Sequence, residues 1–179
     1  LILKNGKLSG VLIDNAGDSL ESFIPKQNAD LIAKALLKAQ DSCIKMGLTT
    51  VDDAGLDRSV IEVIEKLHEN GMLKLRIYAM VTPTLKNLDW YLMNNMYKGE
   101  RLTVRSFKFY GDGALGSRGA CLLQNYSDKE NWKGFLLNTS EYYRDMADRM
   151  DGTNFQMNVH CIGDSAVRNL VRIFSCIPS

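Results

Sequence analysis

The sequence predicts an α/β fold with parallel strands, and more narrowly a partial (β/α)₈ barrel of about four consecutive βα units. Helical and strand patterns alternate along most of the chain, which is the order of a parallel sheet with crossover helices. Three strands have one apolar and one polar face. The chain has 179 residues, whereas a complete barrel takes about 250, so residues 1–179 are predicted to be the central part of one barrel domain, approximately strands two to five.

The elements are predicted from apolar spacing and from turn residues. Apolar residues at helical spacing end at glycine or Asn-Gly, and β-branched or alternating segments follow each helix. Residues 111–138 form a connection that is longer than usual, which indicates a functional or covering loop. The expected order is extended segments over 1–16, helix 28–46, strand 48–53, helix 57–70, strand 73–82, helix 84–96, strand 102–110, loop 111–138, helix 139–150, strand 155–162 and helix 164–174.

The strands distinguish the barrel from an open sheet, because side chains alternate between two faces. Both faces of an open doubly wound sheet are apolar. The inner face of a barrel becomes polar and functional toward the carboxyl ends of the strands. Strict alternation groups the side chains as Arg105, Phe107 and Phe109 against Val104, Ser106, Lys108 and Tyr110, and as Phe155, Met157, Val159 and Cys161 against Gln156, Asn158, His160 and Ile162. Phe107, Phe109, Met157 and Val159 are therefore expected to pack against helices.

Lys108 is a candidate site residue, because an ammonium on an inner barrel face needs a partner. Three interpretations are open. The lysine forms a salt bridge with Asp52, Asp53 or Asp112, or it is a Schiff-base nucleophile, or carbon dioxide converts it to a carbamate that binds metal. His160 lies on the same kind of face one βα unit later. It is either a hydrogen-bonded structural residue or a metal ligand.

The loop "GDGALGSRG" also has two interpretations. Its backbone N–H groups could cradle an anion, or its glycines serve the turns of a covering loop. It lacks the Gly-Lys-Ser/Thr ending of a P-loop. Arg118 is either a partner for a substrate carboxylate or a surface charge. Asp164 is predicted to be the N-cap of the following helix, and His68 is predicted to be solvated near a helix end.

Composition excludes several classes of function. The formal net charge of +1 gives no electrostatic case for nucleic acid or an anionic membrane, and no apolar run approaches the ~20 residues of a membrane helix. The four cysteines lack metal-site spacing, so they are predicted to be reduced thiols. That favours a reducing compartment and a cytoplasmic location. A chain that starts without Met leaves a signal peptide unassessed.

Several motifs resemble the metal-dependent amidohydrolase superfamily, in the branch that includes N-substituted formamide deformylases. The longest is "FKFYGDGALGSRGACL" from Phe107, followed by "YSD" from Tyr126 and "GFLL" from Gly134. "NVHCIGDSAV" is similar to the strand-five signature of that branch, "GLTTVDDAG" to its strand-two segment, and "SGVLIDNA" to the region after strand one. The resemblance runs over nearly the whole chain.

The resemblance implies a TIM-barrel hydrolase that acts on non-peptide C–N bonds of a small amide-type substrate with one or two divalent metals, usually zinc. It implies that Lys108 takes the position of a carboxylated lysine and His160 that of the strand-five metal histidine. Asp112 and Arg118 are the substrate-binding candidates. The residues that transfer protons are not assigned. In such sites the metals lower the pKa of a bound water and polarise the substrate carbonyl.

The chain also departs from the family pattern. The family has a His-x-His pair after strand one, a histidine on strand six and an aspartate on strand eight. No His-x-His occurs in this chain, and strands six to eight are expected to lie outside it. The chain alone is therefore expected to bind metal poorly, to be inactive, and to self-associate through open sheet edges. The rival functions are a Schiff-base lyase that uses Lys108 and a non-catalytic binding domain.

Overall fold

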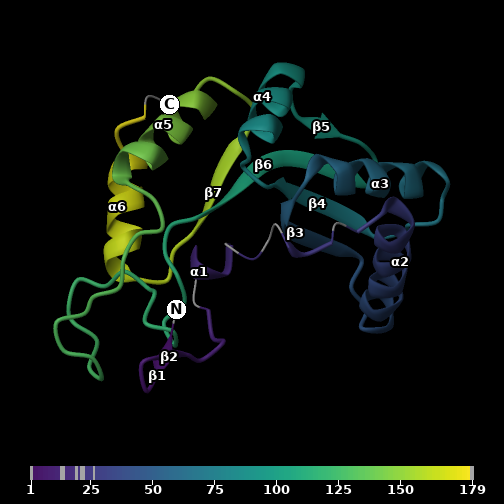
Figure 1. Cartoon of the computed structure of the whole chain (residues 1–179). Helices are drawn as coiled ribbons and strands as arrows, with labels where there is room; N and C mark the ends of the chain where they lie inside the picture. The colour runs from purple at the N-terminus through teal and green to yellow at the C-terminus, as the bar shows by residue number, and fades with distance from the viewer. Residues whose placement is uncertain (1, 13–14, 19, 21–22, 26, 178–179) are drawn as a thin grey trace. The chain divides into compact units, whose positions relative to one another are not determined.

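The computed structural model describes residues 2–12, 15–18, 20, 23–25 and 27–177 (Figure 1). Two predictions lie partly outside this range: the extended segments over 1–16 include residues 1 and 13–14, and the motif "SGVLIDNA" includes residues 13–14. The predicted order of elements is otherwise confirmed, with two additions, the short helix α1 (Asn15–Asp18) and the short strand β5 (Tyr97–Lys98). In chain order the elements are β1 (Leu3–Lys4), β2 (Lys7–Leu8), α1 (Asn15–Asp18), α2 (Ala29–Lys45), β3 (Thr50–Leu56), α3 (Arg58–Glu69), β4 (Arg76–Val81), α4 (Leu85–Asn94), β5 (Tyr97–Lys98), β6 (Leu102–Tyr110), α5 (Ser140–Met150), β7 (Gln156–His160) and α6 (Asp164–Phe174).

The main sheet follows the predicted barrel order. β3, β4 and β6 are parallel neighbours in sequence order, and β7 pairs with β6. This confirms an α/β fold of consecutive parallel strands like part of a TIM barrel. Strict alternation of helix and strand is wrong at one place, because the short β5 pairs antiparallel with β6. Helix α4 ends at Asn94, and Asn95 adopts φ 64° and ψ 174°, a conformation that residues other than glycine rarely adopt, so the chain leaves the helix there.

The chain forms two compact units. The loop unit comprises Leu1–Lys26, Tyr110–Asp151 and Val159–Ser179. The strand unit comprises Gln27–Phe109 and Gly152–Asn158.

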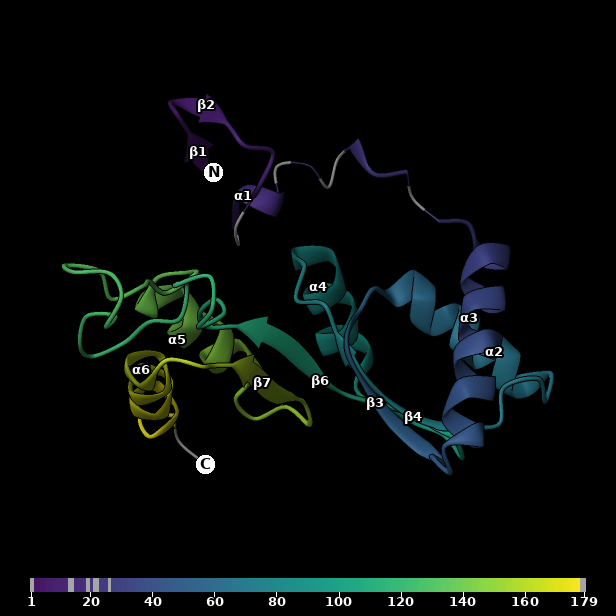
Figure 2. The same cartoon turned by 90° about the horizontal axis from the view of Figure 1, so that it is seen from below.

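The core of the strand unit lies between the sheet and helices α3 and α4, which lie on the same side of β3, β4 and β6 (Figures 1 and 2). Phe107 is fully buried, and its ring lies 6.3 Å from that of Tyr91 on α4 and 5.1 Å from that of Phe155. The predicted helix-packing role of Phe107 is therefore confirmed. Phe109 is also buried, whereas Met157 and Val159 are only half-buried.

A β-bulge at Arg105 decides which way the second half of β6 faces. Ala79 pairs with Val104, but the next residue, Met80, pairs with Ser106, so Arg105 is an extra residue. Its side chain is exposed, and its Nε donates to the carbonyl of Asn154 at 3.2 Å. Strict alternation was wrong for Arg105 and Val104. The buried, helix-packing face of β6 consists of Leu102, Val104, Phe107 and Phe109.

The bulge therefore sets the direction of Lys108. Had β6 alternated without interruption from Leu102, residue 108 would lie on the helix-packing face with Leu102 and Val104. The extra residue instead leaves Thr103, Ser106 and Lys108 on the opposite, inner face. Lys108 therefore points away from the flanking phenylalanines, as alternation predicted, and the bulge decides that this side is the inner face and not the face of Leu102 and Val104.

Strand β3 lies at one edge of the sheet, and most of its residues are exposed. Its outer edge has no partner strand within the part of the chain that the structure describes. An unpaired edge can pair with another chain, but Asp52 and Asp53 place two acidic side chains on this strand. Self-association through β3 stays a prediction.

In the loop unit, helices α5 and α6 contact each other (Figure 1). All four cysteines are thiols outside disulfides, as predicted. No helix among the described residues is both long and apolar enough to cross a bilayer. The apolar side chains that the two helices bury are Tyr143, Met146, Ala147 and Met150 on α5, and Ala166, Leu170 and Ile173 on α6.

Candidate active site at the strand ends

Lys108 lies near the carboxyl end of β6 on the inner face of the strand. Its side chain is half-buried, and its Nζ donates to the carbonyl of Phe109 at 3.1 Å. The half-buried ammonium therefore has a backbone acceptor within its own strand.

His160 is the last residue of β7 and is half-buried. Its ring lies 5.7 Å from that of Tyr110, the last residue of β6. Its backbone carbonyl accepts a hydrogen bond from the Gly111 N–H at 2.7 Å. The backbone hydrogen bond therefore holds the main chain of His160, and the Tyr110 ring lies beside its imidazole. Because Lys108 and His160 belong to different units, a site that they share stays a prediction.

The chemistry of the donor set limits what this chain can hold. Among the described residues, no group of three or more His, Cys, Asp or Glu side chains could hold a metal ion. Protein zinc sites take three or four protein ligands. Lys108 and His160 are suitable ligand types, as a carbamate and an imidazole, but the described residues supply at most part of a metal site.

Asp112 is a buried carboxylate of the loop unit with several hydrogen-bond donors. It is 1% exposed, and its carboxylate accepts three backbone hydrogen bonds. Oδ2 accepts from Cys121 N at 2.8 Å and from Gly163 N at 2.8 Å, and Oδ1 accepts from Ile162 N at 2.9 Å. We name these four groups the Asp112 clamp. The clamp ties the start of the long loop to the turn after β7; substrate contact by Asp112 stays a prediction.

Glycines allow three backbone segments to meet around this clamp. A Cβ on Gly111 would lie 2.8 Å from Cys161 Sγ and 3.0 Å from the His160 carbonyl oxygen. A Cβ on Gly163 would lie 1.9 Å from the carbonyl oxygen of Cys121. Within the loop, the N–H groups of Gly113, Arg118, Gly119 and Ala120 donate to loop carbonyls. These N–H groups of the glycine-rich segment therefore serve its own turns and are not directed at an anion.

Arg118 pairs with an acid of its own loop. Its Nε and its Nη2 contact the two carboxylate oxygens of Asp128, at 3.1 Å and 2.8 Å. This bidentate pair lies at the surface. The hydrogen bond from Arg118 lowers the pKa of Asp128 below its ordinary value, and Asp128 in turn raises the pKa of Arg118. A substrate carboxylate would have to compete with Asp128, so a substrate role for Arg118 stays a prediction.

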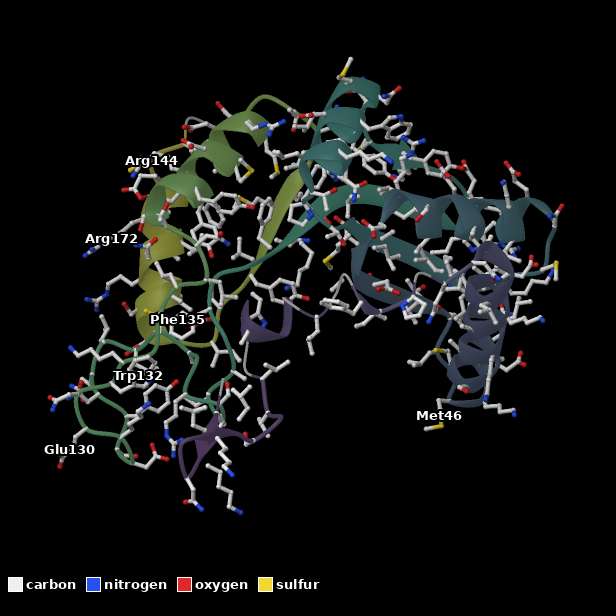
Figure 3. All side chains as sticks on the ribbon, in the orientation of Figure 1. Met46, Glu130, Trp132, Phe135, Arg144 and Arg172 are labelled. Carbon is white, nitrogen blue, oxygen red and sulfur yellow. The ribbon has the colours of Figure 1, made fainter. Side chains whose placement is uncertain are left out.

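We expect Arg118→Met to raise the pKa of Asp128 toward its ordinary value of about 3.9, because the bond that stabilises the carboxylate is lost. In the unaltered protein, the stability that this pair contributes is present above that ordinary value and is lost as the pH falls through the lowered pKa of Asp128. Carboxyl ¹³C NMR titration measures the change. Arg144→Met, which removes an exposed arginine of α5 (Figure 3), should leave the pKa of Asp128 unchanged; an equal shift in both variants would contradict the pairing.

The outer part of the loop carries aromatic packing that the sequence did not reveal. The rings of Trp132 and Phe135 lie 6.2 Å apart (Figure 3), and Lys129 Nζ lies 4.2 Å from the centre of the Trp132 ring. Trp132 Nε1 donates to the carbonyl of Arg118 at 2.8 Å. These contacts give the loop a fixed shape of its own.

A pocket of about 580 Å³ opens beside the same loop. We name it the loop pocket. Both apolar and polar side chains line it, which suits a small ligand with an apolar part. The leucines within the polar loop segment were the sequence signal that could have found it. The lining includes Leu115, Leu122, Leu123, Tyr126, Asp128 and Asp164.

Two sequence predictions about local roles are wrong. Gly163, and not Asp164, is the N-cap of α6. Asp164 is the first helical residue, and its Oδ1 accepts from the Leu123 N–H at 2.9 Å, which adds a second tie between the loop and α6. His68 is half-buried, and its Nε2 lies 2.9 Å from the Leu75 carbonyl oxygen. A carbonyl only accepts, so Nε2 carries the proton and His68 has a structural contact.

Comparison with known proteins gives the chain a family. The model of the "Amidohydrolase family" matches residues 1–175. The chain is 24% identical to "Protein LONG AFTER FAR-RED 3" of Arabidopsis thaliana, over 99% of this chain and 32% of that protein. It is 26% identical to "Putative amidohydrolase YtcJ" of Bacillus subtilis (strain 168), over 97% of this chain and 34% of that protein. The chain thus spans about a third of the length of these relatives.

Solved structures show the same fold. An uncharacterized metal-dependent hydrolase from Pyrococcus horikoshii OT3 is similar with a TM-score of 0.78 and 24% identity, over 89% of this chain and 33% of that one. Its counterpart from Pyrococcus furiosus gives a TM-score of 0.78 and 23% identity, over 89% and 34% of the two chains. The family model matches nearly the whole chain, and the strand order is that of a barrel. This chain therefore belongs to the amidohydrolase family.

Proposed function

We propose that this chain is part of a metal-dependent hydrolase that cleaves non-peptide C–N bonds, such as those of amides and formamides, in a small molecule. Membership of the amidohydrolase family supports a hydrolase. The observation that carries the proposal is the bulge at Arg105, which turns Lys108 to the inner face of β6. A bulge is a means of re-aiming a side chain beside an active site, and the core alone gives no reason to direct a lysine inward.

We assign the metal-binding role to His160 and Lys108, with zinc as the metal. His160 would supply a neutral imidazole nitrogen. The uncharged Lys108 amine would bond the carbon of carbon dioxide through its lone pair and release a proton, and the carbamate formed would supply oxygen ligands. This chain spans about a third of the length of its relatives. The remaining ligands would come from strands in the other two thirds of the complete enzyme. When bound, the metal lowers the pKa of a water and polarises a carbonyl.

The surroundings support a small substrate with an apolar part. The loop pocket, at about 580 Å³, lies within the size range of small-molecule sites, about 300–1,000 Å³. It belongs to the same unit as His160. The fixed loop shape and the Asp112 clamp would let the pocket hold such a substrate without rearrangement, which lowers the entropic cost of binding.

Metal analysis of the complete enzyme, with the strands beyond this chain present, tests the proposal. His160→Asn is expected to lower the zinc retained after dialysis at least tenfold, because a zinc site with one ligand fewer loses most of its affinity. His68→Gln is the matched control, since that histidine contacts the Leu75 carbonyl; it should retain metal like the unaltered protein. Full retention of zinc by His160→Asn would remove His160 from the site and overturn the proposal.

A further inference from the structure

We propose that Asp112 is a positioning residue for His160. The clamp joins three backbone segments of one compact unit: the end of β6, the long loop at Cys121, and the turn after β7 at Ile162 and Gly163. The last two N–H groups lie two and three residues after His160. Holding them fixes the chain immediately beyond the imidazole.

A second contact fixes the same strand end from the other side. The Gly111 N–H donates to the carbonyl of His160 itself at 2.7 Å. Gly111 and Asp112 are consecutive. This dipeptide therefore forms hydrogen bonds with the backbone of His160 and with that of Ile162 and Gly163, which follow it. Tyr143 completes the arrangement from α5, because its hydroxyl donates to the Tyr110 carbonyl at 2.7 Å. The backbone of Tyr110 and Gly111, just before Asp112, is therefore also held by hydrogen bonds.

The site around Asp112 requires a carboxylate. The three other groups of the clamp are N–H donors, and Asp112 is 1% exposed. A charged acceptor that receives several backbone N–H bonds is stabilised without a cation. An asparagine has one acceptor oxygen and one NH₂ group, which only donates. The amide oxygen would take the position of Oδ2, which accepts two hydrogen bonds. The NH₂ group would then face the Ile162 N–H, and two donors cannot form a hydrogen bond with each other.

Asp112→Asn is therefore expected to release one specific amide. Hydrogen exchange at Ile162 should accelerate at least tenfold, and exchange at Cys121 and Gly163 should accelerate less. The ¹³Cε1–¹H NMR signal of the His160 ring, identified by its loss in His160→Asn, should shift or split as the ring leaves its single position beside Tyr110. Asp145→Asn, which removes an exposed carboxylate of α5 in the same unit, should leave both the exchange rates and the ring signal unchanged.

Two results would overturn the inference. One is faster exchange at Ile162 with the His160 ring signal unmoved, since the clamp would then hold the turn without positioning the histidine. The other is seen in the unaltered protein, so it remains available if Asp112→Asn does not fold: the amides of Cys121, Ile162 and Gly163 should exchange through one common opening, and unrelated opening rates would exclude a single clamp. The inference rests on the proposed function only for what His160 binds. Neither readout needs metal or turnover, so a failure of the metal assignment would leave these results interpretable.

Discussion

Gly163→Ala is expected to destabilise the loop unit by more than about 4 kcal/mol, a size that single substitutions reach only by a specific mechanism. The added Cβ would lie 1.9 Å from the carbonyl oxygen and 2.4 Å from the carbonyl carbon of Cys121. Both are backbone atoms, so no side-chain rotation relieves the overlap. The φ of Gly163 is −71°, which any residue adopts, so the site needs glycine for space and not for conformation. The same backbone donates to Asp112 Oδ2, and moving it would open the clamp.

The measurement can be confined to the affected unit. Trp132 lies in the loop unit and Trp90 in the strand unit, so urea unfolding followed by fluorescence in a Trp90→Phe background reports on the loop unit alone. Gly116→Ala is the matched control from the same loop, because nothing lies within 4 Å of its added Cβ. That variant should be neutral or gain up to about 1 kcal/mol from the smaller entropy of the unfolded chain. Equal stability of the Gly163 and Gly116 variants would contradict the close packing.

The fold was predictable because it depends on patterns within single elements. Apolar spacing located α2 to α6, and the alternation of strands with helices gave the parallel order. What alternation could not reveal is the bulge at Arg105, because an extra residue is visible only when two strands are paired. It changed the face assigned to Arg105 and Val104, yet it left Lys108 on the predicted side.

The site was less predictable, because its contacts join residues that are far apart in the chain. The sequence placed Asp112 among the candidates, but the three N–H groups that it binds lie 9, 50 and 51 residues away. The glycine-rich loop had two interpretations until its N–H groups were seen to bond carbonyls of the same loop, and until the carbonyl of His160 showed why Gly111 must lack a side chain. Arg118 was a candidate for an external anion because its partner, Asp128, is ten residues away on the far side of a turn.

Lys108→Ala is expected to lower hydrolysis by the complete enzyme at least about 100-fold, because metal-derived stabilisation of the transition state is worth several kcal/mol and each 1.36 kcal/mol is a factor of ten. Acetate or propionate should restore part of the activity, since a short carboxylate can occupy the place of the carbamate left by the missing side chain. Lys98→Ala, which removes an exposed lysine of β5, should have normal activity with and without added acid.

The same residue separates the three interpretations of the inward lysine. Lys108→Arg keeps the positive charge but cannot form a carbamate or a Schiff base, so full activity in that variant would identify a salt bridge. A Schiff-base lysine would be trapped covalently by borohydride with a carbonyl substrate, and no carboxylic acid would rescue Lys108→Ala. A carbamate predicts the opposite set: an inactive arginine variant, no trapping, rescue by acid, and activity of the unaltered enzyme that depends on dissolved carbon dioxide. The bulge at Arg105 places the amine on the inner face in all three cases, so the difference lies in the chemistry of Lys108 and not in where it points.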